Sequence, residues 1–292
     1  MELRSLRYFL AVVEERHLTR AAEALGIRPT SLSQQIIGLE RDLDTSLFVR
    51  TAGGMVPTAA ADRLVPHALA AVAAARRAAE SVRTRPLLHV AVTPGAPPWV
   101  VAELWRATAD FAPEFTDTQT GEQLVRLRNG ALDLGLLLMP EDLTGLDHIT
   151  IAEAELGAVV AVGHRLAGRT AVQWADLHPS SVLWFSQPCA PGYHQAIQQH
   201  WLRAGWRPSS MRNGSPRRAL FVAELSGGDD VVALRPAWDV RDGDGLVWIP
   251  FASDAPRIRH ALAWSVENPH AAKYATMAAD LACVAVPHKH PE

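Results

Sequence analysis

The sequence predicts an α+β protein of several domains: a small helical module at the N-terminus, a linker helix, and a larger α/β body. Three observations predict this organisation. Two helical patterns meet at a glycine within "LTRAAEALGIRPTSLSQQIIGLERDL" at residues 18–43, and an alanine-rich helical stretch follows at 58–84. From residue 87 onward, short apolar strands alternate with helices. We therefore place the domain boundaries at 1–58, 59–86 and 87–292.

Composition and charge narrow the class of protein. The chain has 292 residues, of which 48% are hydrophobic, a share typical of folded globular domains. It has no apolar run of about 18 residues and no signal-peptide pattern at its start, so we expect a cytoplasmic protein without a membrane partner. Cys189 and Cys283 are too few for a disulfide framework. Residues 1–88 carry 12 basic and 9 acidic side chains, whereas the rest of the chain carries 16 basic and 22 acidic ones. This excess of positive charge in residues 1–88 fits an anionic partner for that segment.

The first 43 residues predict three helices. Thr19 is placed to cap the second helix by accepting a hydrogen bond from a free backbone N–H. Gly26 suits the left-handed residue that ends this helix, and Pro29 suits the first position of the third, where its missing N–H costs nothing. The apolar stripes of the first and third helices follow helical spacing: Leu3, Leu6, Phe9, Leu10 and Val13, then Leu32, Ile36, Leu39 and Leu43.

The outer face of the third helix is polar. The outer and flanking faces carry Thr30, Ser31, Ser33, Gln34 and Gln35, whose hydroxyl and amide groups can bond phosphate oxygens or a base edge. Any one of these residues alone favours an ordinary solvated face. The arrangement of a helix, a glycine turn and a helix that starts with small polar residues favours DNA.

A β-hairpin follows the third helix. "LFVR" and "MVPT" are short strand patterns on either side of Gly53-Gly54, a strong turn signal. A helix-turn-helix followed by a hairpin is a winged helix. Arg50 on the hairpin is placed to reach phosphate or the minor groove.

The alanine-rich stretch predicts a long helix with a seam of small residues. We expect Thr58 to cap it, Pro66 to kink it and Pro86 to break it. The seam suits close packing against a second helix, so this segment predicts the dimer contact between two DNA-binding modules. The seam residues step by four and three: Leu64, Ala68, Ala71, Ala75, Ala78 and Val82.

The front of the chain resembles a known family. "YFLAVVEERHLTRAAEALGI" and "SLSQQIIGLERDLDTSLFVRT" are similar to the N-terminal signature of LysR-type transcriptional regulators. The resemblance implies a homodimer or homotetramer that binds double-stranded promoter DNA and responds to a small-molecule effector. Relatives usually carry Ser-Gln where this chain has Arg28-Pro29, so we do not carry over an operator consensus. The predicted DNA-binding residues are Thr19, Arg28, Pro29, Thr30, Ser31, Ser33, Gln34 and Arg50.

The body resembles the effector-binding domain of the same family, which is similar to periplasmic binding proteins. "LRNGALDLGLLL" and "VQWADL" carry this resemblance. It implies one subdomain at about 87–162 and 266–292 and another at about 163–265, with the chain crossing near Gly163 and Ser265. The alternation of strands and helices predicts largely parallel sheets.

We expect the effector to be a small organic anion, either aromatic or aliphatic, bound between the subdomains. The carboxyl ends of strands form the ligand crevice of α/β sheets, and helix N-termini there suit a carboxylate. In relatives that respond to aromatic acids, positions matching Thr93, Thr120, Pro191 and Tyr193 line the pocket. Helix capping explains the two threonines equally well. The predicted effector-binding residues are Thr93, Pro94, Gly95, Thr120, Gln123, Pro191 and Tyr193.

Two other classes of protein stay open. The sequence lacks G-x-S-x-G, H-E-x-x-H, Walker and G-x-G-x-x-G motifs, so we expect no enzyme, no cofactor and no metal site. Cys189 and Cys283 lie too far apart to match the peroxide-sensing relatives, and "HKH" at 288–290 is a tail. One alternative is a ligand-binding or catalytic α/β protein whose winged helix serves assembly only. The other is a constitutive architectural DNA-binding protein without a ligand.

Overall fold

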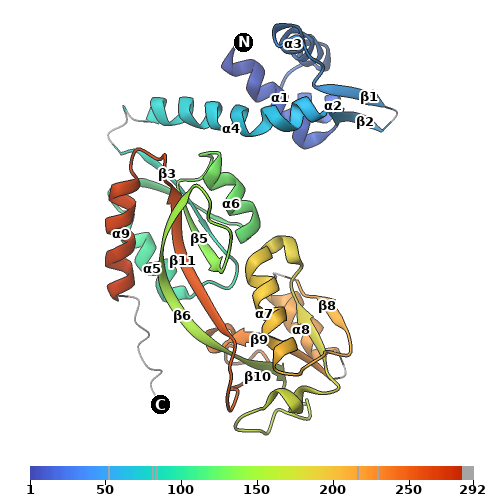
Figure 1. Ribbon diagram of the computed structural model, residues 1–292, viewed down its shortest axis with the longest axis vertical. Helices are drawn as coiled ribbons and strands as arrows, with labels where there is room; N and C mark the ends of the chain where they lie inside the picture. The colour runs from blue at the N-terminus through green and yellow to red at the C-terminus, as the bar shows by residue number, and fades with distance from the viewer. Residues whose placement is uncertain (52, 81, 83–84, 216, 229, 285–292) are drawn as a thin grey trace. The chain divides into compact units, whose positions relative to one another are not determined.

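The computed structural model describes residues 1–51, 53–80, 82, 85–215, 217–228 and 230–284 (Figure 1). The chain divides into two compact units. Unit 1 comprises Met1–Pro86 with Arg128–Ala131, and unit 2 comprises Leu87–Leu127 with Leu132–Glu292. The predicted tail at 288–290 lies outside the described residues.

Unit 1 begins with the three predicted helices: α1 (Leu3–Glu15), α2 (Leu18–Ala24) and α3 (Pro29–Asp42). Gly26, just past α2, has a φ of +64°, the left-handed conformation that glycine adopts without strain. Pro29 is the first residue of α3, as predicted. The helices share one apolar core, which contains Leu6, Phe9, Val12, Ala21, Ala22, Leu32, Ile36 and Leu39.

Thr19 does not cap α2, and this prediction is wrong. The helix begins one residue earlier, at Leu18, with His17 in the cap position and no side-chain hydrogen bond there. Leu18 packs against the core of unit 1. Apolar contact at the helix start competes with a capping bond, which contributes only about 1 kcal/mol.

The wing is an antiparallel hairpin of β1 (Phe48–Thr51) and β2 (Gly54–Pro57), as predicted. Two contacts attach it to the helices. The Oε1 of Glu40 in α3 accepts hydrogen bonds from the N–H groups of Leu47 and Phe48, at 2.7 and 3.1 Å. Gly54 lies so close to the carbonyl of Arg16 that an added Cβ would overlap it. The hairpin is therefore fixed to both α3 and the end of α1.

The linker helix α4 spans Ala59–Glu80. Thr58 caps it as predicted, because its Oγ1 accepts a hydrogen bond from the N–H of Ala61 at 3.2 Å. The helix continues across Pro66 and ends at Glu80, before the predicted stop at Pro86. Of the predicted seam, Ala68 is buried in the core of unit 1 and Leu64 packs against that core, so these two residues are not open to a second helix, whereas Ala71 is exposed.

Unit 2 contains a mixed sheet that has nine strands among the described residues (Figure 1). The strand order is β4-β3-β5-β11-β6-β9-β7-β8, and β10 pairs with β6. The strands are β3 (Leu87–Val92), β4 (Ala112–Asp117), β5 (Leu134–Met139), β6 (Leu146–Ala161), β7 (Ser181–Trp184), β8 (Met211–Asn213), β9 (Val231–Pro236), β10 (Leu246–Ile249) and β11 (Arg257–Ser265). The helices are α5 (Pro98–Ala107), α6 (Thr120–Arg128), α7 (Pro191–Arg203), α8 (Arg218–Ser226) and α9 (Ala271–Val284), with short 3₁₀ turns at Trp174–Leu177, Gln187–Cys189 and Ala237–Asp239.

The sheet is less parallel than predicted. β3 pairs in parallel with β4 and β5, and β7 with β8 and β9, but β11 and β6 pair antiparallel with all their partners. The strand and helix patterns of the sequence do not predict β8, α8 or the first half of β6. Alternating polar residues in "LDHITIAEAEL" mark that half of β6 as partly exposed, so it lacks the continuous apolar run of a buried strand such as β5.

β6 and β11 connect two lobes of unit 2. β6 pairs with β11 as far as Glu155 and with β9 from Leu156 onward. One apolar core lies around β3, β5, α5 and α9, and a second around β7, β9 and α7. Gly163 and Ser265, the predicted crossing points, lie just past β6 and at the end of β11. We call the part with the first core lobe I and the part with the second lobe II.

Candidate functional site

The exposed face of α3 forms the first candidate site. Thr30, Ser31 and Gln34 are exposed on the helix, whereas Leu32 and Ile36 are buried. The structure therefore separates a polar face from the core face, as the spacing predicts. Arg28 and Pro29 at the helix start and Thr19 on α2 are also exposed.

The wing and α3 meet through two of the predicted residues. Arg50 on β1 donates a hydrogen bond from Nη2 to the Oγ of Ser33 on α3, at 2.8 Å. Because Ser33 accepts from Arg50, its own hydroxyl hydrogen stays available for an acceptor outside the protein. The remaining guanidinium N–H groups of Arg50 suit phosphate oxygens. This pair joins the wing to the polar face in one interface suited to a nucleic acid.

A cavity of about 180 Å³ in unit 2 forms the second candidate site. Residues from both lobes line it. Four of the seven predicted effector residues are among them: Thr93, Pro94, Gly95 and Tyr193. The other lining residues are Gln119, Leu138, Leu156, Trp184, Phe185, Ser186, Cys189, Ala190, Asn213, Gly214, Ser215, Leu234, Arg235, Pro236, Asp239 and Ile258.

Thr120 and Gln123 lie behind the cavity wall instead of lining it. The Thr120 hydroxyl donates to Thr93 Oγ1 at 3.3 Å and accepts from the N–H of Leu138 at 3.0 Å. Gln123 is fully buried, and its Nε2 donates to the carbonyl of Thr118 at 2.6 Å. Their hydrogen bonds join the ends of β3, β4 and β5 next to Thr93, so both side chains support the cavity wall without lining it.

Pro191 is exposed at the first position of α7 and does not line the cavity. The N-terminus of α7 was predicted to receive the effector's carboxylate. In the structure a carboxylate of the chain itself is bound there, because Glu141 accepts hydrogen bonds from the N–H groups of Gly192 and Tyr193 at 3.0 and 3.3 Å.

Arg235 is the main residue that the sequence analysis missed. It lies on β9 and lines the cavity, and its Nε is buried without a hydrogen-bond partner among the described residues. Asp239 lies 3.7 Å from this Nε, close enough for charge attraction but too far for a hydrogen bond. A signal was present in "VVALRP", where a single arginine interrupts an otherwise buried strand.

Aromatic rings form much of the wall on the side of lobe II. The rings of Phe185 and Tyr193 stack with their centroids 6.0 Å apart and their planes 4° from parallel. The ring centroid of Trp184 lies 6.2 Å from that of Tyr193. The indole N–H of Trp184 has no hydrogen-bond partner among the described residues. Burial raises the pKa of the Tyr193 phenol above its ordinary value, against the lowering effect of the Arg235 charge. Tyr193 is therefore a neutral ring in this wall.

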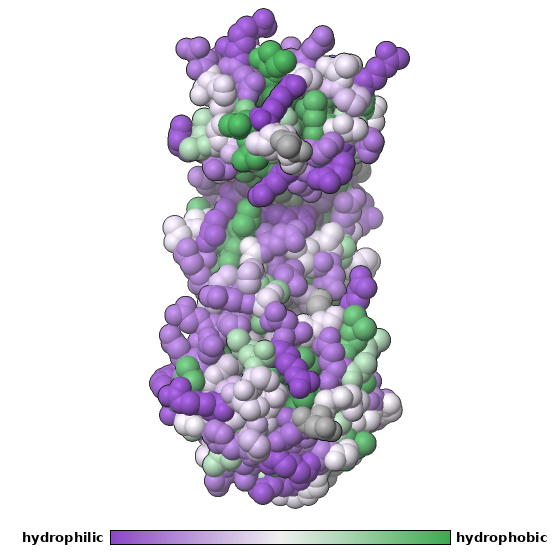
Figure 2. Space-filling model, turned by 90° about the vertical axis from the view of Figure 1, so that its right-hand side faces the viewer, coloured by the Kyte–Doolittle hydropathy of each residue, from purple (hydrophilic) through white to green (hydrophobic). Residues whose placement is uncertain are grey.

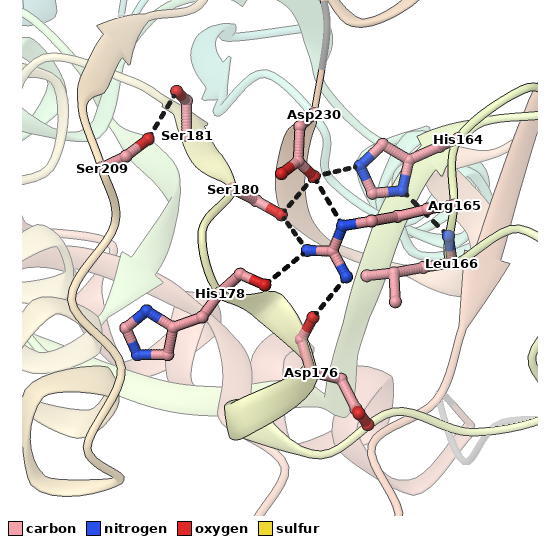
Figure 3. Close-up of polar contacts among 9 residues, drawn as sticks. All are labelled: His164, Arg165, Leu166, Asp176, His178, Ser180, Ser181, Ser209 and Asp230. Carbon is pink, nitrogen blue, oxygen red and sulfur yellow. Dashed lines mark hydrogen bonds and ion pairs between the residues drawn. The ribbon is translucent and has the colours of Figure 1, made fainter.

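A separate polar network in lobe II contains serine, histidine and aspartate (Figure 3). Asp230 Oδ1 accepts from Ser180 at 2.7 Å and from Arg165 Nε at 3.1 Å, and it lies 2.8 Å from His164 Nε2. Although burial acts to raise it, the bond from Ser180 and the charge of Arg165 hold the pKa of Asp230 below its ordinary value. The Ser180 hydroxyl points at the carboxylate and not at the imidazole, so His164 is not placed to activate it. The network ties loops together.

Among the described residues, no group of three or more histidine, cysteine, aspartate or glutamate side chains could hold a metal ion. None of the helices in the described ranges has the length and apolar character needed to span a membrane. The face drawn in Figure 2 is mainly hydrophilic, with hydrophobic residues in small separate groups.

The chain combines a helix-turn-helix that has a polar outer face with a two-lobed domain that encloses a ligand-sized cavity. This combination defines a DNA-binding regulator with an effector-binding domain. Comparison with protein families agrees. The bacterial regulatory helix-turn-helix protein, lysR family, matches residues 3–62, and the LysR substrate binding domain matches residues 83–282. The chain belongs to the LysR family of transcriptional regulators.

Relatives and solved structures extend this likeness along the chain. A probable hydrogen peroxide-inducible genes activator of Mycobacterium xenopi is 34% identical over 179 residues, covering 58% of this chain and 95% of the relative. The Hca operon transcriptional activator HcaR of Escherichia coli (strain K12) is 29% identical over 274 residues, covering 90% and 92%. The crystal structure of CbnR, a LysR family transcriptional regulator, has a TM-score of 0.72 at 20% identity, covering 97% and 99%, which establishes a shared fold.

Proposed function

We propose that this regulator binds a small aromatic carboxylate in the cavity of unit 2, and that the bound effector changes how α3 and the wing engage promoter DNA. One observation carries the ligand class. Arg235, which lies over the Phe221 ring and 3.7 Å from Asp239, brings a guanidinium to a cavity wall that also holds stacked aromatic rings.

A carboxylate satisfies this wall better than a neutral ligand does. Arginine binds carboxylates through parallel, charge-assisted hydrogen bonds. The flat surfaces of Phe185 and Tyr193 suit a planar ring beside them. A neutral ligand of the same shape forms no charge-assisted hydrogen bond and leaves Arg235 with Asp239 as its ion-pair partner, so its affinity is lower.

Calorimetry of the full-length protein tests the ligand class. The probes are benzoate and trans-cinnamate, each compared with its amide. A charge-assisted hydrogen bond contributes about 1.5–3 kcal/mol, so we expect the carboxylates to bind roughly 10- to 150-fold more tightly than the amides. Arg235→Met should abolish this preference. Arg259→Met, which removes an exposed arginine paired with Glu153, is the matched control.

Two outcomes of this titration contradict the proposal. One is that the amides bind as tightly as the carboxylates. The other is that Arg235→Met and Arg259→Met behave alike, since the preference would then arise away from Arg235.

For DNA we propose that α3 enters the major groove with Ser33 and Gln34 toward the base edges, while Arg50 and Arg28 contact the backbone. The exposed polar face and the bond between Arg50 and Ser33 support this assignment. A gel-shift assay on the divergent promoter beside the protein's own gene tests it. The absence of any shift at low salt would favour the alternative in which the winged helix serves assembly only.

We also propose the assembly and its place in the cell. The open Ala71 face of α4 supports a homodimer through paired linker helices, and the effector domains complete a homotetramer. Because the partner is promoter DNA, we assign the protein to the cytoplasm. The domain boundaries stay as proposed, at 1–58, 59–86 and 87–292.

A second candidate effector is hydrogen peroxide. Cys189 lines the cavity, and the M. xenopi relative is named a probable hydrogen peroxide-inducible genes activator. The reaction would convert the Cys189 thiol and peroxide into a sulfenic acid and water. Mass spectrometry after peroxide treatment separates the candidates: rapid gain of one oxygen on Cys189, but not on exposed Cys283, would favour peroxide over a carboxylate.

A further inference from the structure

Two glycines bring the lobes of unit 2 into close backbone contact. Gly121, the second residue of α6 in lobe I, lies against the carbonyl of Pro188 in lobe II. Gly192, the second residue of α7 in lobe II, lies against the carbonyl of Pro140 in lobe I. At both positions an added Cβ would overlap the facing oxygen. Each lobe therefore presents a helix start without a side chain to the backbone of the other.

Glu141 adds a charged contact beside the Gly192 approach. Its Oε2 accepts from the N–H of Gly192 at 3.0 Å, and its Oε1 accepts from the N–H of Tyr193 at 3.3 Å. These N–H groups belong to the first turn of α7, so they have no acceptor within the helix. A negative charge is also favoured there by the helix dipole. Both oxygens of one carboxylate are thus used across the junction of the lobes.

We propose that Glu141 is a latch that holds the lobes closed over the cavity, and that its release admits and discharges the effector. The inference rests on the proposed function in one respect, namely that the cavity is the effector site. Glu141 does not line the cavity. It is a positioning residue, because it fixes the start of α7 and with it the Tyr193 ring in the cavity wall.

The latch also orients the effector. A carboxylate already occupies the start of α7, so a second anion there would meet like charge. The guanidinium of Arg235 is the favourable alternative within the same cavity. The effector therefore binds with its carboxylate toward β9 and away from α7.

An ordinary helix cap differs from a latch in a measurable way. A cap within one lobe stabilises its own helix and leaves the contact between lobes unchanged. Here the acceptor follows β5 in lobe I, whereas the donors start α7 in lobe II. Breaking these bonds must therefore weaken both the start of α7 and the closure of the lobes.

Cys189 provides a reporter of closure that needs no effector. It lines the cavity and lies directly after Pro188, whose carbonyl faces Gly121. The sequence has two cysteines, so in full-length Cys283→Ser protein Cys189 is the single thiol. Cys189 is partly exposed, so the change in its alkylation rate by iodoacetamide between variants, followed by mass spectrometry, reports a change in closure.

In this background we expect Glu141→Gln to raise the Cys189 alkylation rate about tenfold, equivalent to about 1.4 kcal/mol of lost closure. Glu141→Asp should restore part of the protection. Glu122→Gln, which removes an exposed carboxylate on α6, is the matched control and should leave the rate unchanged. Hydrogen exchange at residues 190–196 should also accelerate in Glu141→Gln.

Faster exchange at 190–196 with an unchanged alkylation rate would make Glu141 a simple cap and overturn the latch. Unchanged exchange and alkylation would overturn it as well. A stopped-flow arm with trans-cinnamate then tests regulation, and both its association and dissociation rates should rise in Glu141→Gln. If trans-cinnamate does not bind the wild type, the proposed ligand class fails, while the alkylation result still decides the latch.

Discussion

Replacing His260 with leucine should remove part of the acid sensitivity of unit 2. His260 lies on β11 between Leu138 of β5 and Ala152 of β6, and its side chain is fully buried. Neither ring nitrogen has a hydrogen-bond partner among the described residues. Burial lowers the pKa of His260 from 6.5 to about 3, because the charged imidazolium would lose its hydration.

The sign and size of the effect follow from proton linkage. Well above pH 6.5 the imidazole is neutral in both the folded and unfolded states and contributes no pH dependence. Below that pH the unfolded chain binds a proton that the folded chain excludes, so stability falls until about pH 3. At about 1.36 kcal/mol per pH unit, the wild type should lose roughly 2 kcal/mol from this residue by about pH 5. The loss over the whole range is at most roughly 5 kcal/mol.

Urea unfolding followed by tryptophan fluorescence measures this effect at about pH 7.5 and about pH 5. All nine tryptophans lie beyond residue 98, so the signal reports unit 2. His260→Leu should lose roughly 2 kcal/mol less than the wild type on acidification. His148→Leu, at an exposed histidine, should behave like the wild type. Equal acid losses in His260→Leu and the wild type would refute the reasoning.

Three further predictions concern unit 1. Ala71→Glu with Ala75→Glu places charge in the α4 seam and should lower the oligomeric state measured by sedimentation. An unchanged oligomeric state would refute a dimer contact through this seam. Ser33→Ala and Arg50→Ala should each weaken operator binding, with a coupling energy of roughly 0.5–3 kcal/mol in a double-mutant cycle, whereas additive losses would show that the two residues act independently. Gly54→Ala should lower the melting temperature of unit 1 by circular dichroism, because its φ is +123° and Arg16 blocks a Cβ. The tryptophan signal should not change in that variant, and an unshifted melting curve would contradict the close contact.

Local signals predicted most of the fold of unit 1. Gly26, Pro29 and Thr58 each occupy the position that their backbone chemistry requires, so turn and cap rules located them. Thr19 was misplaced because apolar packing of Leu18 set the helix start, and such packing is visible only in three dimensions.

The cavity was only partly predictable. Thr93 and Tyr193 lie next to a strand end and a helix start, which the general rule for α/β sheets identifies. Arg235 lies inside a strand, and its relation to the cavity depends on how β9 is placed between β6 and β7. The role of Glu141 could not be predicted for a similar reason, because its partners Gly192 and Tyr193 are 51 and 52 residues away in the chain.

Operator binding measured with and without trans-cinnamate, by fluorescence anisotropy and footprinting, tests the central claim most directly. The claim is that occupation of the cavity in unit 2 alters DNA binding by unit 1. In the wild type we predict a change in operator affinity of about 5- to 150-fold, or a footprint of altered length, and Arg235→Met should require a much higher concentration for the same change. A carboxylate that binds the wild type with wild-type affinity yet leaves operator affinity and footprint unchanged would contradict the account.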